Sequence, residues 1–501
     1  MEYNKLYPNG ATISVLYGLP KVHKEGTPMR PICSAIGSAT YDLSKHLANI
    51  IRPAASNTIG TDLKDTFQFV EQVNGIDLSN KYMVSYDVKS LFTNVPLVET
   101  IDITMNRLYR SEHVTAPNMP EAVLRNLLEL CVCDNLFLFN GKVYKQTDGV
   151  AMGNSLGPLL ANIFMAHIEE EFIFKTTQEF HPSFYRRYVD DTFCIFNNAE
   201  EAERFHEFIN NVHPSISFDM EFEVDGKLGF LDTWVRKTDS GPAELSTKVK
   251  HTDRGLFYHI KSFVPDKQKF NLAYNLINRI YRIASNMTIF HTDFTSLKQR
   301  LLRNGFSEKL VCECADKVLT KYRSTDHQNE KTITVPKRAV TVCLPFLGPL
   351  SYSVKRNLLT LVNKFYPSVE LKVVFSRGFK IRNLFAYKDK FPMKCRSMLV
   401  YYTQCSVCGP SQAYLGKTKN TVYERFYTSG IGHLAPNNAS SALLGHLNES
   451  ISPNCSFDFD KVKIVESGTF DEQIRFIESI LLKYEKQTLN TQDRSIKLNI
   501  V

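Results

Sequence analysis

Two adjacent aspartates, Asp190 and Asp191, form the pattern with the clearest chemical meaning in this sequence. Apolar residues alternate on either side of them, which predicts two short strands joined by a tight turn at the acidic pair. Carboxylates forced together repel each other unless a cation neutralises them, and a hard divalent metal with oxygen ligands is the expected cation. The alternative for an isolated Asp-Asp pair is a solvated turn.

A third carboxylate is available to bind metal together with this pair. Asp87 ends another apolar, strand-like run about a hundred residues upstream. One aspartate at a strand end and two at a hairpin are the minimum set for a two-metal site that transfers nucleotides. We therefore expect Asp87, Asp190 and Asp191 to bind Mg²⁺ or Mn²⁺.

Further residues are candidates for contacts with a nucleotide. Arg30 is held between prolines and is suited to gripping a triphosphate. Phe92 follows Asp87 by five residues, where its ring would exclude a 2′-hydroxyl; core packing is the alternative. Gly153 and Gly157 open an apolar helix, and a missing Cβ would let a base pair approach the backbone closely. A hairpin at residues 228–232 is expected near the primer end.

The composition indicates a globular protein of two or three domains. The 501 residues are too many for one core, and 43% are apolar and 22% charged. No apolar run is long enough to span a membrane, and the N-terminal residues lack the apolar region of a signal peptide. The 11 cysteines are mostly single and lie in apolar segments, which favours reduced thiols in a cytosolic or nuclear protein.

Positive charge is concentrated in one segment. Residues 330–396 hold 14 Lys or Arg and 3 Asp or Glu, whereas the whole chain has a net charge of +8. Aromatic residues lie among these charges, so a surface that faces nucleic acid is expected, with a solvated linker as the alternative. The aromatic residues are Tyr352, Phe365, Tyr366, Phe375, Phe379, Phe385 and Tyr387.

Periodicity suggests where the domains divide. Helical spacing dominates residues 263–319, and the polar stretch 324–336 is the best candidate for a linker. A small βαβ-like block follows over residues 341–375. The last hundred residues begin again with a strand-like run at Met398 and finish in an amphipathic helix with Phe470 and Ile474 on its apolar face.

The C-terminal hundred residues contain a candidate zinc site. Cys405 and Cys408 form a Cys-x-x-Cys pair, and two thiolates with two later imidazoles fit a tetrahedral Zn²⁺. His446 and His433 are the predicted imidazole ligands, with Cys455 as the alternative to His433. Without metal, the pair would be a redox motif or buried thiols.

The motifs of the first half resemble the reverse transcriptase of Penelope-like retroelements. They are LYGLPKVHK (16–24), MRPI (29–32), SLFTNVP (90–96), DGVAMG (148–153), YVDD (188–191) and GFLD (229–232). The resemblance implies an α+β right-hand polymerase, with an antiparallel palm sheet and a helical thumb. It also implies Asp87, Asp190 and Asp191 as ligands of two Mg²⁺, Arg30 at the triphosphate, Phe92 as the sugar gate and Gly153 at the template–nucleotide pocket. A longer N-terminal segment and a second basic residue for the triphosphate are expected from the family, and a shortened copy is one interpretation.

The C-terminal block resembles the GIY-YIG endonuclease domain that these elements carry after the polymerase. The resemblance assigns Tyr401 and Tyr414 as the motif tyrosines, Arg425 as the helix arginine and Glu478 as the ligand of a single divalent metal. A tyrosine that relays a proton, an arginine on the phosphate and a metal on the leaving oxygen would suffice for phosphodiester hydrolysis.

The expected organisation is therefore an α+β multidomain protein. The ranges are 1–240 for partial fingers and palm, 241–325 for the thumb, 326–395 for a basic connector and 396–501 for a small α/β nuclease with a zinc-binding insert. The expected function is target-primed reverse transcription with template RNA, target DNA, primer and dNTPs, in the nucleus and cytoplasm and without a membrane. The alternatives are an inactive remnant that binds nucleic acid and a telomerase-like or intron-type polymerase.

Overall fold

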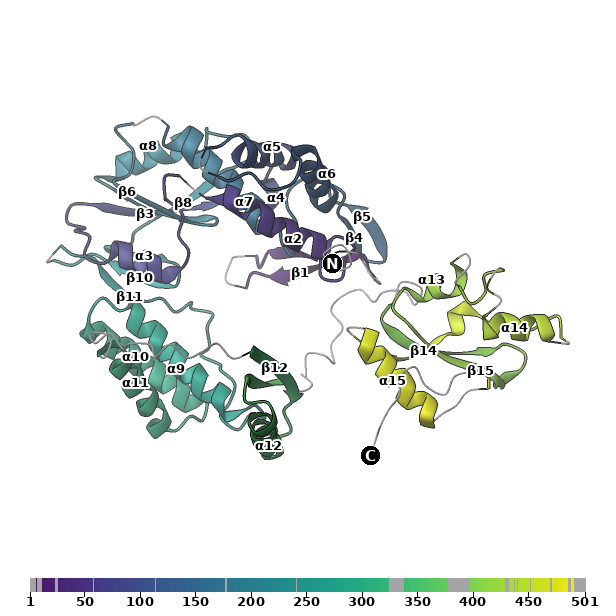
Figure 1. Cartoon of the computed structure of the whole chain (residues 1–501). Coiled ribbons are helices and arrows are strands. Elements are labelled where there is room, and N and C mark those ends of the chain that lie inside the picture. The colour runs from purple at the N-terminus through teal and green to yellow at the C-terminus, as the bar shows by residue number, and fades with distance from the viewer. Residues whose placement is uncertain are drawn as a thin grey trace.

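The computed structural model describes most of the chain (Figure 1). The described residues are Leu6, 11–22, 26–56, 58–112, 114–175, 178–239, 241–323, 338–376, 397–428, 432–436, 438, 440–450, 452–468, 471–484 and 488–490. The predicted linker at 324–336 and the predicted apolar residue Phe470 lie outside them. No described helix is long and apolar enough to cross a membrane.

A four-stranded antiparallel sheet positions the predicted aspartates. Its order is β6-β7-β3-β8. The strands are β3 (Tyr82–Val88), β6 (Phe184–Tyr188), β7 (Asp191–Phe196) and β8 (Phe218–Phe222). The β6–β7 connection is the predicted tight turn, with Tyr188 paired to Asp191 across it.

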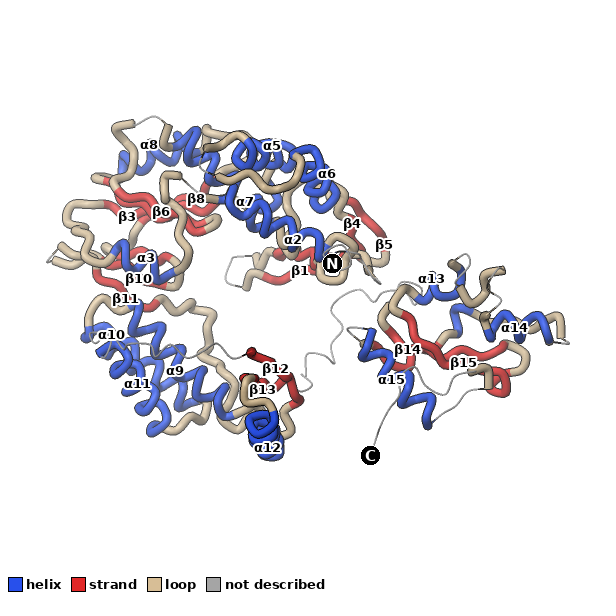
Figure 2. The backbone as a smooth tube through the Cα atoms, in the orientation of Figure 1, coloured by secondary structure: helices blue, strands red, loops and turns tan. Residues whose placement is uncertain are grey.

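Side chains alternate along β3 and supply a core on each face of this sheet. Val84 and Tyr86 pack into a cluster with helices on one face, and Met83 packs into a second cluster on the other. The helices of the first face include α5 (Leu97–Tyr109), α7 (Gly157–Ile168) and α8 (Ala199–Ile209), and a π-helix, Glu169–Ile173, follows α7 directly (Figure 2). Apolar clusters thus pack against both faces of the sheet.

A second sheet, of order β2-β1-β4-β5, lies within residues 1–240, the range predicted to hold the partial fingers and the palm. Its β1 and β2 form an antiparallel hairpin in which Leu19 lies opposite Arg30. The strands are β1 (Ser14–Pro20), β2 (Met29–Ser34), β4 (Leu136–Phe139) and β5 (Lys142–Lys145). The remaining helices of this half are α2 (Tyr41–Ile51), α3 (Thr66–Val73), α4 (Leu91–Asn94) and α6 (Glu121–Val132).

A three-stranded sheet and a helical bundle follow. The sheet has the order β11-β10-β9, with β9 (Lys227–Phe230), β10 (Thr233–Arg236) and β11 (Glu244–Thr247). It extends past residue 240, where the sequence analysis divides the chain, because β11 is hydrogen-bonded to β10. The bundle consists of α9 (Asp266–Ile283), α10 (Met287–Arg303) and α11 (Glu308–Arg323) around its own apolar cluster.

The basic segment contains a folded βαβ unit, as its sequence pattern predicts. The parallel strands β12 (Arg338–Pro345) and β13 (Val369–Ser376) are joined through α12 (Pro349–Phe365). Tyr352 and Phe375, expected to face nucleic acid, instead pack against each other and Phe346, with ring centroids 5.8–5.9 Å apart. Phe365 and Tyr366 are exposed. The predicted residues Phe379, Phe385 and Tyr387 lie outside the described residues.

The C-terminal unit is built on an antiparallel sheet of order β15-β14-β16. Its strands are β14 (Leu399–Cys405), β15 (Gly409–Thr418) and β16 (Lys463–Ser467), and its helices are α13 (Val422–Tyr427), α14 (Ala442–Glu449) and α15 (Asp471–Tyr484). Ile474 of α15 packs on the sheet with Val400 and Leu415.

Candidate active sites

The four-stranded sheet of order β6-β7-β3-β8, here called the palm sheet, brings together the three aspartates predicted to bind metal. Asp87 lies opposite Asp191 in the β3–β7 ladder, and the backbone N–H of Val88 donates to the carbonyl oxygen of Asp190 at 3.0 Å. The turn that carries Asp190 has an unusual backbone, because Val189 has a φ of 60°. A β-branched residue avoids this left-handed region, so the turn is strained and must be held by its surroundings.

The structure adds a fourth carboxylate that the sequence analysis missed. Asp219 on β8 lies opposite Asp87 in the ladder on the other side of β3. Lys89 forms an ion pair with it at 2.8 Å, although both side chains are more than half exposed. Asp219 is placed here by the pairing of β8 with β3, and the sequence alone does not predict that pairing.

A cavity of about 600 Å³ lies beside the carboxylates. Asp87 and Asp190 line it together with the predicted triphosphate ligand Arg30. Two further lysines, Lys21 and Lys89, also line the cavity. Lys21 follows β1 directly, so the hairpin places it near Arg30; it is a candidate for the second basic residue that the sequence analysis could not assign.

Phe92 and Gly153 occupy different positions relative to this cavity. Phe92 lines it and also packs against the large helical core, so both interpretations of this ring fit its location. Gly153 does not line it, whereas its neighbour Met152 does. A Cβ on Gly153 would lie 2.4 Å from the carbonyl oxygen of Cys33, and its φ is 124°. Close packing on β2 is therefore one reason for this glycine. The predicted approach of a base pair stays a prediction.

Asp87 also lines a second cavity, of about 540 Å³. The predicted hairpin forms between β9 and β10, and Gly229 and Asp232 line this cavity. Lys248 and Lys250 also line it and give it positive charge beside the carboxylates. Such a surface suits the phosphates of a nucleic-acid strand that ends at the metal site.

In the C-terminal unit, the two predicted tyrosines lie side by side. Tyr401 on β14 faces Gly416 on β15, and the Tyr401 and Tyr414 ring centroids are 6.3 Å apart. A Cβ on Gly416 would lie 2.5 Å from Cε1 of Tyr414 and 2.9 Å from the hydroxyl of Tyr401. The glycine thus makes room for both phenols against the strand. Asn490 holds the same strand, because its side chain bonds both the N–H and the carbonyl of Leu415.

Arg425 and Glu478 converge with Tyr414 on a cavity of about 470 Å³. Burial raises the pKa of Glu478 to about 7, although Lys417 and Arg425 oppose the shift. Among the described residues, the buried Nε of Arg425 and Oε2 of Glu478 have no hydrogen-bond partner. Buried polar atoms are seldom left without partners, so these two atoms indicate a ligand-binding site. Lys417 and Asp471, which the sequence analysis did not single out, form an ion pair at its wall.

The prediction that His433 binds zinc is wrong in this structure. Its Nε2 lies 2.6 Å from the hydroxyl of Tyr401, and its Nδ1 lies 3.3 Å from Oγ of Ser441. His433 is buried, and burial lowers its pKa to about 3, so the ring is neutral and shares a hydrogen bond with the Tyr401 hydroxyl. His433 lies beside Tyr401, near the start of β14, whereas Cys405 is the last residue of that strand.

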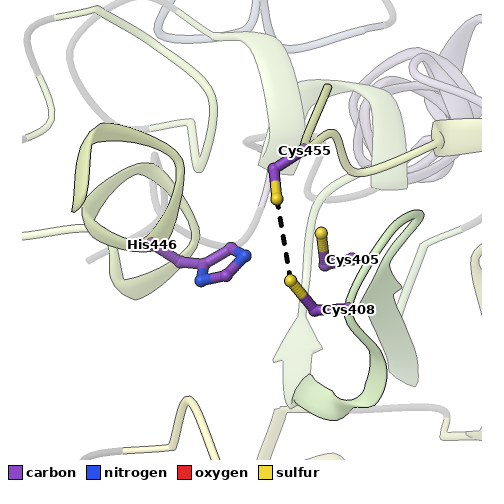
Figure 3. Close-up of side chains that lie close together, drawn as sticks. All are labelled: Cys405, Cys408, His446 and Cys455. Atoms are coloured by element: carbon purple, nitrogen blue, oxygen red, sulfur yellow. Dashed lines mark hydrogen bonds between the residues drawn. The ribbon is translucent and has the colours of Figure 1, made fainter. Parts of the chain in front are cut away.

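Cys455, the alternative, completes the cluster with Cys405, Cys408 and His446 (Figure 3). Their ligand atoms all lie within 4.8 Å of one another, and the Cys408 and Cys455 sulfurs are 3.6 Å apart. Sulfurs in a tetrahedral zinc site lie about 3.8 Å apart, since each Zn–S bond is about 2.3 Å.

The surroundings of this cluster also suit a metal. Burial opposes ionisation of Cys405, but hydrogen bonds from the backbone N–H groups of Cys408 and Val407, together with those from the His446 and Cys455 side chains, lower its pKa to about 6. Nε2 of His446 is buried and has no partner within the described part of the chain. Three sulfurs and one imidazole are therefore compatible with Zn²⁺.

Comparisons with known proteins agree with the first of these sites. Residues 22–219 match the family model described as reverse transcriptase (RNA-dependent DNA polymerase), and residues 256–314 match the animal helix-turn-helix domain. The first range contains the carboxylates and most of the cavity beside them. No curated protein is a significant match to the chain.

Several solved structures align with part of the chain. Telomerase from Candida albicans, in complex with a fragment of telomeric RNA, aligns with a TM-score of 0.41 and 9% identity over 65% of this chain and 66% of that one. Apo telomerase from Candida tropicalis gives 0.38 and 11% over 63% and 59%. The RNA-dependent RNA polymerase of a sicinivirus gives 0.38 and 12% over 63% and 70%.

The chain thus spans 66% or less of these telomerase chains. The match to the reverse transcriptase family model over residues 22–219, a range that contains Asp87, Asp190 and Asp191, supports a reverse transcriptase-like protein.

Proposed function

We propose that this protein is an RNA-directed DNA polymerase of the Penelope-like type, joined to a GIY-YIG endonuclease that nicks DNA. The observation that carries the polymerase assignment is the single cavity shared by two palm carboxylates, Asp87 and Asp190, and three basic residues, Lys21, Arg30 and Lys89. A nucleoside triphosphate with its divalent cations has the charges that this lining complements.

In the polymerase, Asp87, Asp190 and Asp191 would hold two Mg²⁺ or Mn²⁺ ions. Such ions activate a primer 3′-hydroxyl and neutralise the departing pyrophosphate. Arg30 and Lys21 would bind the triphosphate, and Phe92 would exclude a ribose 2′-hydroxyl. Lys248 and Lys250 would bind phosphates of the primer strand in the second cavity.

In the endonuclease, Arg425 would bind the scissile phosphate and Glu478 would hold one divalent cation. That cation would stabilise the leaving oxygen. Tyr414 lines the cavity, and Tyr401 lies behind it with its hydroxyl against His433. The neutral imidazole would hold the Tyr401 hydroxyl in place by a hydrogen bond, and a tyrosine of this pair would relay a proton from the attacking water.

Zinc would stabilise the C-terminal unit at the end where the cysteines lie. Cys405 and Cys408 come from the β14–β15 hairpin, His446 from α14 and Cys455 from the following loop. A Zn²⁺ bound by all four would crosslink segments that are about fifty residues apart in the sequence.

The two activities together would perform target-primed reverse transcription. The nuclease would nick target DNA, and the polymerase would extend the new 3′-hydroxyl on template RNA with dNTPs, in the nucleus. The basic βαβ unit would contact nucleic acid between them. A catalytically inactive remnant that binds nucleic acid is the second candidate; the cavity shared by Asp190 and Arg30 favours the enzyme.

Separate substitutions at the two sites test this proposal. Asp87→Asn in the full chain should abolish dNTP incorporation on poly(rA)/oligo(dT) and leave the nicking of supercoiled plasmid in Mg²⁺ unchanged. Glu478→Ala should have the opposite effect. The two results together require two independent metal sites in one chain.

An unchanged Asp87→Asn polymerase would contradict the palm assignment, and undiminished nicking by Glu478→Ala would contradict the nuclease assignment. Arg425→Ala provides the control against contaminating nucleases, because it should lose nicking as well. A wild-type protein that binds RNA and DNA but performs neither reaction would support the inactive remnant.

A further inference from the structure

A charged pair is completely buried beneath the strained turn that carries Asp190. Arg187 on β6 and Glu169, the first residue of the π-helix after α7, are both 0% exposed. Arg187 Nε lies 2.6 Å from Glu169 Oε1, and Arg187 Nη2 lies 3.2 Å from Oε2. The arrangement is bidentate, which is the most directional way for a guanidinium and a carboxylate to meet.

The carboxylate is also bonded by its other neighbours. The hydroxyl of Tyr185 donates to Glu169 Oε1 at 2.9 Å, and the hydroxyl of Thr61 donates to Oε2 at 2.8 Å. Residues from two separate segments, β6 and the loop that contains Thr61, therefore fix one carboxylate. Such a group holds its guanidinium partner in a single orientation.

That orientation directs the remaining guanidinium nitrogen to the catalytic turn. Arg187 Nη1 donates to the carbonyl oxygen of Val189 at 3.2 Å and to Oδ1 of Asn162 on α7 at 2.9 Å. Val189 is the residue held in the left-handed region, with a φ of 60°. The Arg187 side chain thus connects the turn before Asp190 to α7. Met152, in the loop before α7, lines the cavity of about 600 Å³ that Asp190 also lines.

Stability alone does not explain this pair. Buried ion pairs can often be replaced by apolar side chains without loss of stability, because burial of two charges is costly. A strained turn, in contrast, persists only where surrounding bonds over-determine it, and such turns occur at functional sites. π-Helical turns such as the one that begins at Glu169 are also common at functional sites.

We infer that Arg187 and Glu169 are positioning residues that hold the Val189–Asp190 turn in the conformation in which the palm carboxylates bind divalent cations. This inference rests on the proposed polymerase function for its catalytic readout. Neither residue lines either cavity beside the carboxylates, so both act through the turn.

The test replaces both charges at once, so that no buried charge is left unpaired. The full chain with Arg187→Met and Glu169→Leu is compared with wild type and with a matched control, Arg107→Met with Glu170→Leu. The control removes a neighbouring, mostly buried pair (2.6 Å) whose arginine bonds the backbone at Ala54 and Ser56, far along the chain from the turn. All proteins carry Glu478→Ala, so that the nuclease site does not bind the added metal.

Three quantities are measured: Mn²⁺ binding by electron paramagnetic resonance, kcat for dNTP incorporation, and the urea midpoint of unfolding. For the Arg187/Glu169 variant we expect Mn²⁺ affinity and kcat to fall by about 10–100-fold. The control should change the urea midpoint without changing Mn²⁺ affinity. Equal Mn²⁺ affinity in wild type and the Arg187/Glu169 variant would overturn the inference, as would an equal loss in the control.

A third substitution addresses the backbone directly. Val189→Gly, added to the Arg187/Glu169 variant, should recover much of the lost Mn²⁺ affinity, because glycine adopts a positive φ without support. A variant that is impaired but gains nothing from Val189→Gly would show that the pair does not act through the turn. If wild type incorporates no nucleotide, the proposed function fails, and Mn²⁺ binding still decides this inference.

Discussion

The zinc site offers the sharpest choice between two residues that the sequence left as alternatives. Cys455→Ser should remove a ligand from a cluster whose four atoms lie within 4.8 Å, whereas His433→Ala changes a ring that bonds Tyr401 instead. Structural zinc binding contributes about 10–16 kcal/mol, so loss of one ligand of four costs about 3 kcal/mol if shared equally. That cost weakens zinc binding about a hundredfold.

Zinc content of the purified full chain, measured by atomic emission after dialysis against a weak chelator, provides the assay. Wild type and His433→Ala should each retain zinc in equimolar amount, and Cys455→Ser should lose it. Cys343→Ser is a matched control, because Cys343 is an exposed cysteine outside the cluster. Zinc loss in His433→Ala together with retention in Cys455→Ser would refute the geometry described above.

Three further substitutions have defined outcomes. Phe92→Val should raise the ratio of rNTP to dNTP incorporation if the ring is a sugar gate; an unchanged ratio with a lower melting temperature would make it a core residue. Gly416→Ala should cost about 1–3 kcal/mol in urea unfolding and reduce nicking, because its Cβ would lie 2.5 Å from the ring of Tyr414; full nicking would contradict that packing. Lys21→Ala should raise the KM for dNTP about tenfold or more, as Arg30→Ala should, and an effect on kcat alone would argue against a triphosphate contact.

Much of the palm could be predicted because its signals are local. Alternating apolar residues around Asp190 and Asp191 fix a hairpin, and the β6–β7 register confirms it. The parallel pair β12 and β13 likewise follows from two apolar runs separated by a helix. Such patterns depend on the repeat of side-chain direction along a strand or a helix, so they can be recognised without knowing which distant segments are in contact.

The residues that sequence reasoning missed depend on contacts between distant segments. Asp219 joins the carboxylates only through the β3–β8 ladder, and Glu169 meets Arg187 only once α7 packs beneath the palm sheet. His433 has metal-ligand chemistry, but the fold places it against Tyr401. At Gly153 the sequence suggests that a Cβ is unfavourable, and only the structure shows that the carbonyl oxygen of Cys33 would meet it.

The central claim is that the palm carboxylates perform Mg²⁺-dependent DNA synthesis on an RNA template. The most direct measurement is the rate of dNTP incorporation on poly(rA)/oligo(dT) by the full chain and by Asp190→Asn, over a range of Mg²⁺ concentrations. We expect wild type to incorporate dTMP and the variant to be slower by at least about a thousandfold at every concentration, with a folded structure retained by circular dichroism. Equal rates for wild type and Asp190→Asn, above the rate without protein, would contradict the claim.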